Sequence, residues 1–205
     1  MRKKSAVTES SRRGYHHGDA RNALLGAAAD LLEKDGAAGL SLRQVAEQAG
    51  LSRQAPYNHF ENKEALLAEL VREGFERLAI ALAAGVDPKA KSALERAAEA
   101  YIRRAQEAPA LFRLMFSREL VELSRFPAAA QAGATAFGKL KAIVAAFAPA
   151  DRVPELSLAA WSLVHGYATL CIEVSLEPDA RRGARARLFA RIIRAAAGTT
   201  RSEES

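Results

Sequence analysis

Residues 41–60 read SLRQVAEQAGLSRQAPYNHF, and their spacing decides the fold. Ser41 precedes a short run with apolar residues at helical spacing, and Gln44 follows three residues later, as in a capping box. Gly50 ends that helix, and Ser52 is the expected N-cap of a second short helix only two residues on. Two short helices joined by so tight a turn must cross steeply, which predicts a helix-turn-helix.

The second short helix carries polar side chains of the kinds that contact a nucleic-acid duplex. Arg53 can donate two hydrogen bonds to guanine, and Gln54 or Asn58 can pair twice with adenine. Tyr57 and His59 are better suited to phosphates. A solvated helix face is the alternative interpretation of any single residue, but their concentration on one helix favours a surface that enters the major groove.

Periodic stretches on both sides of this segment predict an all-α protein. Asp19 is a good N-cap for a first helix, which Gly36 ends in a left-handed conformation. Asn62 starts a long helix with a leucine-rich face. Further helices are expected near residues 91–107, 109–123, 129–147, 152–176 and 181–197. The total is about nine helices.

The charge of the chain permits a polyanionic partner without demanding one. Of its 205 residues, 30 are basic and 24 are acidic, for a net charge of +6. Much of the basic excess precedes Asp19, in residues that contain little to bury and are therefore expected to form a flexible arm over 1–18. The basic residues of this arm are Arg2, Lys3, Lys4, Arg12 and Arg13.

Cysteine and histidine usage gives no sign of a disulfide, metal or cofactor. Cys171 is the only cysteine, and the adjacent His16 and His17 have no third ligand at useful spacing. No apolar run is long enough to cross a bilayer, so no membrane partner is expected. These features favour a cytoplasmic, nucleoid-associated protein.

The quoted residues resemble the TetR family of transcriptional regulators. The likeness is strongest over residues 19–70 and is carried by Ser41–Ala46, Ala49–Ser52, Tyr57–Phe60 and Asn62–Leu67. It implies an N-terminal three-helix helix-turn-helix domain, joined by a long helix to a C-terminal helical domain that binds an effector and dimerises. The implied division is an arm over 1–18, a DNA-binding domain over 19–66, a ligand-binding and dimerisation domain over 67–198, and a disordered tail over 199–205.

The resemblance also implies roles for individual residues. Tyr57, His59 and Lys63 would hold the phosphate backbone. The side chains expected to approach base edges are Arg43, Arg53, Gln54 and Asn58. The full expected DNA-binding set is Arg43, Ser52, Arg53, Gln54, Tyr57, Asn58, His59, Lys63, Arg12 and Arg13. Pro56 departs from the family, which often has Leu or Ile there; because it lies in the first turn after Ser52, we expect a tightened start and not a broken helix.

Bulky side chains in the alanine-rich C-terminal half either fill a core or line a cavity. The residues alone favour a core, whereas the resemblance favours an effector cavity. Trp161, His165 and Gly166 are similar to a Trp-His-Gly signature of one TetR subgroup. His165 either hydrogen-bonds an effector or is a packing histidine with a backbone partner. The candidate ligand-binding residues are Phe112, Met115, Phe116, Phe137, Trp161 and His165.

By the same resemblance, the last two helices pair with those of a second copy as a four-helix bundle. The candidate interface residues are Leu163, Gly166, Tyr167, Leu170, Leu188 and Ile192. The arginines of the last helix, from Arg181 to Arg194, are expected on its solvent side.

These expectations combine into a repressor that binds a palindromic DNA operator as a homodimer and is released by a small apolar effector. The alternative is an effector-independent, architectural DNA-binding protein. A more remote alternative is an enzyme that uses His165 with Cys171. Their spacing of six residues puts them on different helix faces, so no enzymatic activity is expected.

Overall fold

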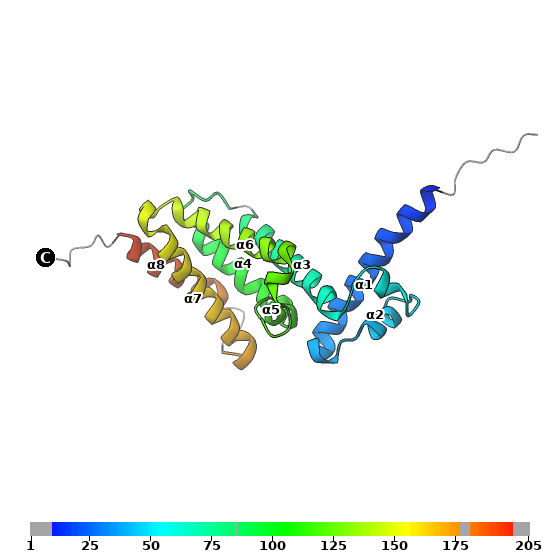
Figure 1. Cartoon of the computed structure of the whole chain (residues 1–205). Helices are drawn as coiled ribbons and strands as arrows, with labels where there is room; N and C mark the ends of the chain where they lie inside the picture. Colours follow the sequence, from blue (N-terminus) through cyan, green and yellow to red (C-terminus); the bar gives the residue numbers. More distant parts are fainter. Residues whose placement is uncertain (1–9, 85, 177–180, 199–205) are drawn as a thin grey trace, which may run out of the picture. The chain divides into compact units, whose positions relative to one another are not determined.

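The computed structural model describes residues 10–84, 86–176 and 181–198, and for residues 10–18 it describes the backbone alone (Figure 1). Every regular element within these residues is helical, which confirms the all-α prediction, with eight α-helices against about nine expected. The chain divides into two compact units between Leu70 and Val71. No helix in the described part is long and apolar enough to cross a membrane.

The first unit contains α1 (Ser10–Gly39), α2 (Leu42–Gln48), the 3-10 helix η1 (Ala55–Asn58) and the start of α3 (Lys63–Ala83). Asp19 was expected to cap the first helix, but α1 already begins at Ser10, so that prediction is wrong. A capping preference is weak beside the continuation of a helix that has already formed. Residues 10–18, expected to belong to an arm without regular structure, are helical.

Gly36 breaks α1 at the predicted position and with a positive φ, but α1 continues to Gly39, and the ψ of Gly36 is extended and not that of a left-handed helical cap. Its φ of 72° and ψ of 171° lie in a region that is essentially restricted to glycine. The buried face of α1 before this point includes Leu24, Ala28 and Leu32. The change of direction at Gly36 leads the chain to Leu40, which is also buried.

The start of α2 follows the expected cap with one difference. Ser41 Oγ accepts a hydrogen bond from the Gln44 backbone N–H at 3.3 Å. The Gln44 side chain does not reach back to the Ser41 amide; its Oε1 accepts from the Ser41 hydroxyl at 2.6 Å. Leu42, Val45 and Ala46 are buried and Gly50 has a φ of 66°, so the tight turn forms as predicted.

The second short helix is the main local departure from expectation. It is a 3-10 helix over Ala55–Asn58, and the side chain of Ser52 does not cap it. The Tyr57 backbone N–H donates to Gln54 O at 3.2 Å, in the i to i+3 pattern. Pro56 has no N–H and disfavours α geometry at Ala55. The whole segment, and not its first turn alone, therefore adopts the tighter 3-10 geometry.

The start of α3 is capped by Asn62, whose Oδ1 accepts from the Ala65 backbone N–H at 2.9 Å. The predicted leucine-rich face is buried, with Leu66 and Val71 both at 0% exposure. Arg21 links α1 to this helix, because its Nη2 lies 2.5 Å from Glu69 Oε2. The same guanidinium lies 5.5 Å from the centre of the Phe60 ring.

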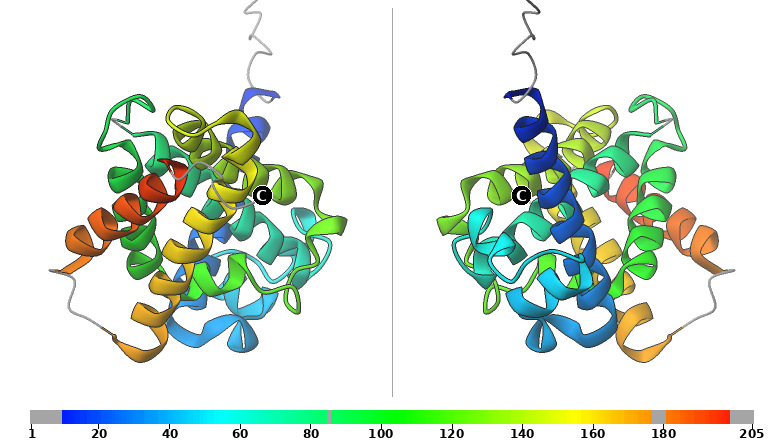
Figure 2. Two further views of the ribbon diagram at one scale, coloured as in Figure 1. Left: turned by 90° about the vertical axis from the view of Figure 1, so that its left-hand side faces the viewer. Right: turned by 90° about the vertical axis from the view of Figure 1, so that its right-hand side faces the viewer.

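The second unit is a helical bundle in which α4 (Ala93–Glu107) contacts α6 (Pro127–Ala145), α7 (Val153–Val174) and α8 (Arg182–Gly198). The views of Figure 2 show α7 and α8 side by side, as their contacts require. Alanines on α4 let these helices approach, and Tyr101 and Ile102 fill the space between them.

The helix α5 (Pro109–Met115) is shorter than the expected span of 109–123. The chain turns at Ser117, whose carbonyl oxygen accepts from the Val121 backbone N–H at 3.3 Å, and Val121 enters the core. No Pro or Gly marks this break in the sequence, and tertiary burial decides it. The short helices η2 (Leu123–Arg125) and η3 (Ala150–Arg152) complete the unit.

Candidate functional site

The first candidate surface is the exposed side of the segment from Ser52 to His59. Arg53, Gln54, Tyr57 and Asn58 are exposed, and Tyr57 retains 54% of its accessible surface. Pro56 is buried on the opposite side. The segment therefore turns four polar side chains outward from an apolar base.

The other expected DNA-binding residues surround this segment or lie beyond it. Ser52 and Arg43 are exposed, while His59 and Lys63 are half-buried. The His59 ring lies 6.3 Å from that of Phe60, which anchors the end of η1. Arg12 and Arg13 lie outside the residues whose side chains are described.

The second candidate site is an aromatic cluster in the second unit. The Phe116 ring lies 5.1 Å from Phe112, 4.4 Å from His165 and 6.3 Å from Trp161. Phe137 joins the cluster at 5.2 Å from Trp161. Five of the six expected ligand-binding residues thus lie together, although they come from α5 and its C-cap, from α6 and from α7.

Two cavities border this cluster. The larger, here called the aromatic cavity, has a volume of about 460 Å³. The smaller, here called the histidine cavity, has a volume of about 240 Å³. The aromatic cavity includes among its walls Val71, Phe75, Met115, Phe116, Phe137 and Trp161. The histidine cavity includes Phe112, Phe116, Ser117, His165, Thr169 and Ile172. Every expected ligand-binding residue therefore lines at least one of the two.

Sequence reasoning missed Tyr101, which is 2% exposed on α4. Its hydroxyl lies 2.9 Å from His165 Nδ1 and its ring lies 5.7 Å from Trp161. Burial raises the pKa of the Tyr101 phenol and lowers the pKa of the His165 imidazole, so both groups are neutral at pH 7. A tyrosine on the inner face of α4 requires a hydrogen-bond partner, and that requirement was the available signal.

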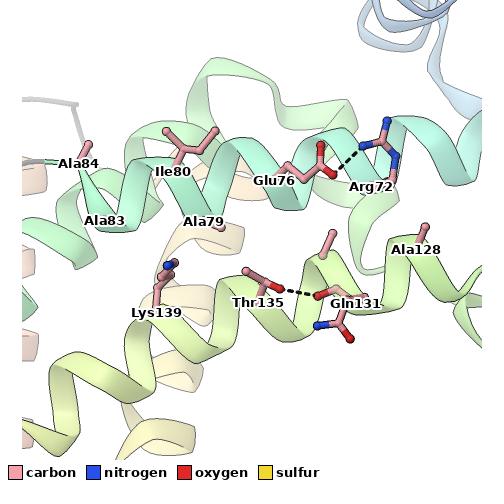
Figure 3. A pocket seen from close by; sticks show the side chains of 11 residues that line it. Arg72, Glu76, Ala79, Ile80, Ala83, Ala84, Ala128, Gln131, Thr135 and Lys139 are labelled. Atoms are coloured by element: carbon pink, nitrogen blue, oxygen red, sulfur yellow. Dashed lines mark hydrogen bonds and ion pairs between the residues drawn. The ribbon is translucent and has the colours of Figure 1, made fainter.

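A third hollow, which the sequence did not suggest, is an open groove of about 750 Å³ between α3 and α6 (Figure 3). Ala79 and Ala83 on α3 and Ala132 on α6 give it an apolar floor. At its edge, Ile80 is 69% exposed. The groove is larger than either cavity, and besides its alanines it is lined by the polar side chains of Arg72, Glu76, Gln131, Thr135 and Lys139.

An exposed apolar face runs along α7 and α8. Leu170 and Ile192 are 47% and 45% exposed, Gly166 is exposed, and Leu163 and Leu188 are half-buried. Tyr167, the sixth expected interface residue, is instead buried against Phe189 of the same chain, with ring centres 5.4 Å apart.

The arginines of α8 were expected on its solvent side, and for Arg182 and Arg194, which are half-buried, this is wrong, whereas Arg187 is exposed as expected. Arg182 donates to Gln106 at 2.8 Å, Arg194 donates to the Lys91 carbonyl at 2.9 Å, and Arg187 lies 3.6 Å from Glu95. Long arginine side chains reach to α4 and to the residues just before it, while α8 buries its small residues Ala186 and Ala190.

Comparisons with known proteins agree with this geometry. A model of bacterial regulatory proteins of the tetR family matches residues 24–70, and a model described as a tetracyclin repressor-like C-terminal domain matches residues 94–199. No curated protein sequence matches the chain.

Solved structures of similar fold cover most of the chain. A protein of unknown function from Rhodococcus sp. RHA1 is 32% identical, with a TM-score of 0.71 over 86% of this chain and 96% of its own. A tetR-family regulatory protein from Rhodococcus RHA1 is 21% identical, with a TM-score of 0.69 over 85% and 96%. The TetR-family regulator PfmR from Thermus thermophilus is 24% identical, with a TM-score of 0.63 over 82% and 97%.

Proposed function

Because the chain belongs to the tetR family of bacterial regulatory proteins, we propose that it is a repressor that a small apolar effector releases from a palindromic operator. Members of this family are DNA-binding transcription factors and not enzymes. The observation that carries the proposal is the outward projection of Arg53, Gln54, Tyr57 and Asn58 from a segment whose other side is buried.

In this proposal the first unit reads DNA with the segment from Ser52 to His59. Arg53, Gln54 and Asn58, together with Arg43 on α2, approach base edges. Tyr57, His59 and Lys63 hold phosphates, supported by the hydroxyl of Ser52 and by Arg12 and Arg13 of the N-terminal region. A 3-10 segment of four residues offers few base contacts, so selectivity requires a second copy on the same operator.

The second copy is supported by the apolar face of α7 and α8. Leu163, Gly166 and Leu170 on α7 would pack with Leu188 and Ile192 on α8 against the same residues of a partner, as a four-helix bundle. Two reading segments would then enter successive major grooves, roughly 34–36 Å apart.

The aromatic cavity is the proposed effector site, since apart from Ser117 and Arg118 its walls are apolar and its volume falls in the usual range of about 300–1,000 Å³. The pattern of Trp161, His165 and Gly166 supports the further proposal that the chain belongs to the Trp-His-Gly subgroup. Helix α3 belongs to both units, and its Val71 and Phe75 line the cavity. An effector that binds better when α3 has shifted would favour the state that does not hold DNA.

Operator binding tests the DNA-reading role. The full chain is titrated with the intergenic DNA beside its own coding region and with a random duplex of equal length, at several salt concentrations. Arg53→Ala should lower discrimination between the two by about 1–3 kcal/mol, while Lys63→Ala should weaken both and reduce the salt slope by about one. Arg77→Ala is the matched control, because it removes an equal charge from an exposed ion pair on α3.

Equal affinity of the wild-type protein for both duplexes at physiological salt would instead favour the architectural alternative.

Effector binding is tested separately by tryptophan fluorescence. Trp161 is the only tryptophan and lines the aromatic cavity, so its fluorescence reports occupancy of that cavity. A compound that quenches Trp161 should release the operator over the same concentration range. Phe137→Ala should shift the concentration at which the compound quenches Trp161 and the concentration at which it releases the operator by the same factor. Ile80→Ala, in the α3–α6 groove, should shift neither. Unchanged operator affinity with the cavity occupied would remove the effector mechanism.

A further inference from the structure

The hydrogen bond between Tyr101 and His165 determines which imidazole nitrogen carries the proton. The Tyr101 hydroxyl is buried, and His165 Nδ1, at 2.9 Å, is its hydrogen-bond partner among the described residues. If the hydroxyl accepted from Nδ1–H, its own proton would be left buried without an acceptor. Tyr101 therefore donates to Nδ1, and Nε2 of the neutral ring carries the hydrogen.

The surrounding rings hold this imidazole in place. The His165 ring lies 5.3 Å from Phe112 at an interplanar angle of 31° and 4.4 Å from Phe116 at 63°. His165 is half-buried and forms part of the wall of the histidine cavity. Because Nδ1 is occupied by Tyr101, Nε2–H is the ring group left to serve that cavity. The result is a fixed hydrogen-bond donor beside the rings of Phe112 and Phe116, in a cavity whose lining also includes the hydroxyl groups of Ser117 and Thr169. A few fixed polar groups set among apolar ones are the usual means of orienting a small ligand.

We propose that the histidine cavity binds a small uncharged molecule through a carbonyl oxygen, which accepts the hydrogen bond from Nε2–H of His165. This inference rests on the proposed function, since it names the chemical class that the effector-binding unit recognises. The ligand is small, because the cavity volume of about 240 Å³ falls below the usual range for drug-sized molecules, about 300–1,000 Å³.

The charges around the cavity favour a neutral ligand over an anion. Arg113 and Glu173 both line it, and Arg113 Nε lies 2.7 Å from Glu173 Oε1, so the two charges compensate each other. Burial also lowers the pKa of His165, which keeps the imidazole uncharged. A carboxylate would thus lose its hydration without gaining an unpaired cation, whereas a carbonyl oxygen requires a single donor.

Phe116 and Ser117 line the aromatic cavity as well as the histidine cavity. A ligand in the smaller cavity therefore contacts a wall of the larger one. Since the Phe116 ring lies 6.3 Å from Trp161, tryptophan fluorescence can follow binding at either place.

The test uses the full-length protein with three probes of similar size. Acetophenone carries a neutral carbonyl, ethylbenzene lacks an acceptor, and benzoate is an anion. Acetophenone should bind more tightly than both other probes, by roughly two- to tenfold, which is the range of one net hydrogen bond. Equal binding of acetophenone and ethylbenzene, or tighter binding of benzoate, would overturn the proposal.

Nitrogen NMR of the imidazoles supplies a readout that packing alone would not move. The chain has four histidines, so the His165 signals can be assigned by substitution. Nδ1 of His165 should be the unprotonated nitrogen in the free protein, and acetophenone should shift the Nε2 signal. Tyr101→Phe should weaken this tautomer preference while the aromatic packing remains. A proton on Nδ1 in the wild-type protein would contradict the assignment.

Two substitutions of His165 separate the donor from the shape of the site. His165→Leu should remove the preference for acetophenone over ethylbenzene, and His165→Gln, which keeps a donor beside an acceptor, should retain part of it. If His165→Leu fails to fold, the wild-type NMR result and the His165→Gln titration still decide the matter. A preference unchanged in both variants would overturn the proposal.

Failure here is distinguishable from failure of the proposed function. If an effector released the operator without any change in the His165 Nε2 signal, the proposed repressor function would stand and the proposed carbonyl-binding site would be wrong. If the protein bound acetophenone selectively at His165 but bound no operator, the carbonyl-binding site would stand and the proposed repressor function would be wrong.

Discussion

Two glycines of α1 provide a matched pair of substitutions with opposite expected signs. Gly36 has a φ of 72° and a ψ of 171°, whereas Gly26 lies within the regular helix. A Cβ added at either position meets no atom within 4 Å, so neither substitution introduces a steric clash. The two variants therefore differ only in backbone conformation.

The magnitudes follow from that difference. Gly36→Ala forces a side chain into a region that costs about 1–3 kcal/mol, offset by roughly 0.4–1 kcal/mol from the restricted unfolded chain. A net loss of about 1–2 kcal/mol of stability in the first unit is expected. Gly26→Ala should instead gain about 0.8–1 kcal/mol from helix propensity.

Native-state hydrogen exchange is the appropriate assay, because Trp161 lies in the second unit and its fluorescence would not report on the first. The amides of Leu24 and Leu32 on the buried face of α1 should exchange faster in Gly36→Ala and slower in Gly26→Ala. The reasoning would be refuted if Gly36→Ala slowed the exchange of these amides as much as Gly26→Ala does. The fold would then not require a glycine conformation at position 36.

Further expectations concern the second unit. Leu170→Arg should convert the proposed dimer to a monomer in sedimentation experiments, whereas Ile80→Arg, at the more exposed α3 position, should leave the mass unchanged; a dimer in both variants would place the interface elsewhere. Burial lowers the pKa of His165 below its usual 6.5, so the folded state binds fewer protons than the unfolded one and stability should fall as the pH drops below about 6.5. His165→Gln should flatten that part of the profile of melting temperature against pH, and a parallel profile would contradict the assignment to His165.

The helix-turn-helix could be predicted from the sequence because its signals are local. The cap at Ser41, the positive φ at Gly50 and the Asn62 cap each depend on neighbours within a few residues. The identity of the polar side chains after Ser52 was equally readable. The helical type of that segment was not, because the effect of Pro56 was expected to stop at the first turn.

The second unit shows the limit of local reasoning. The end of α5 at Met115 depends on the burial of Val121, and no helix-breaking residue marks it. The partners of the α8 arginines depend on α4, which lies far away in the chain.

The amino-acid sequence by itself therefore determined the all-helical class, the tight turn and the set of polar groups available for DNA, because helix periods and caps act over short distances. Only the tertiary structure decided that Tyr101 meets His165, 64 residues away, and which imidazole nitrogen is left to a ligand. The side chains that a residue contacts depend on how the helices pack, and residue spacing along one helix does not indicate which other helices pack against it.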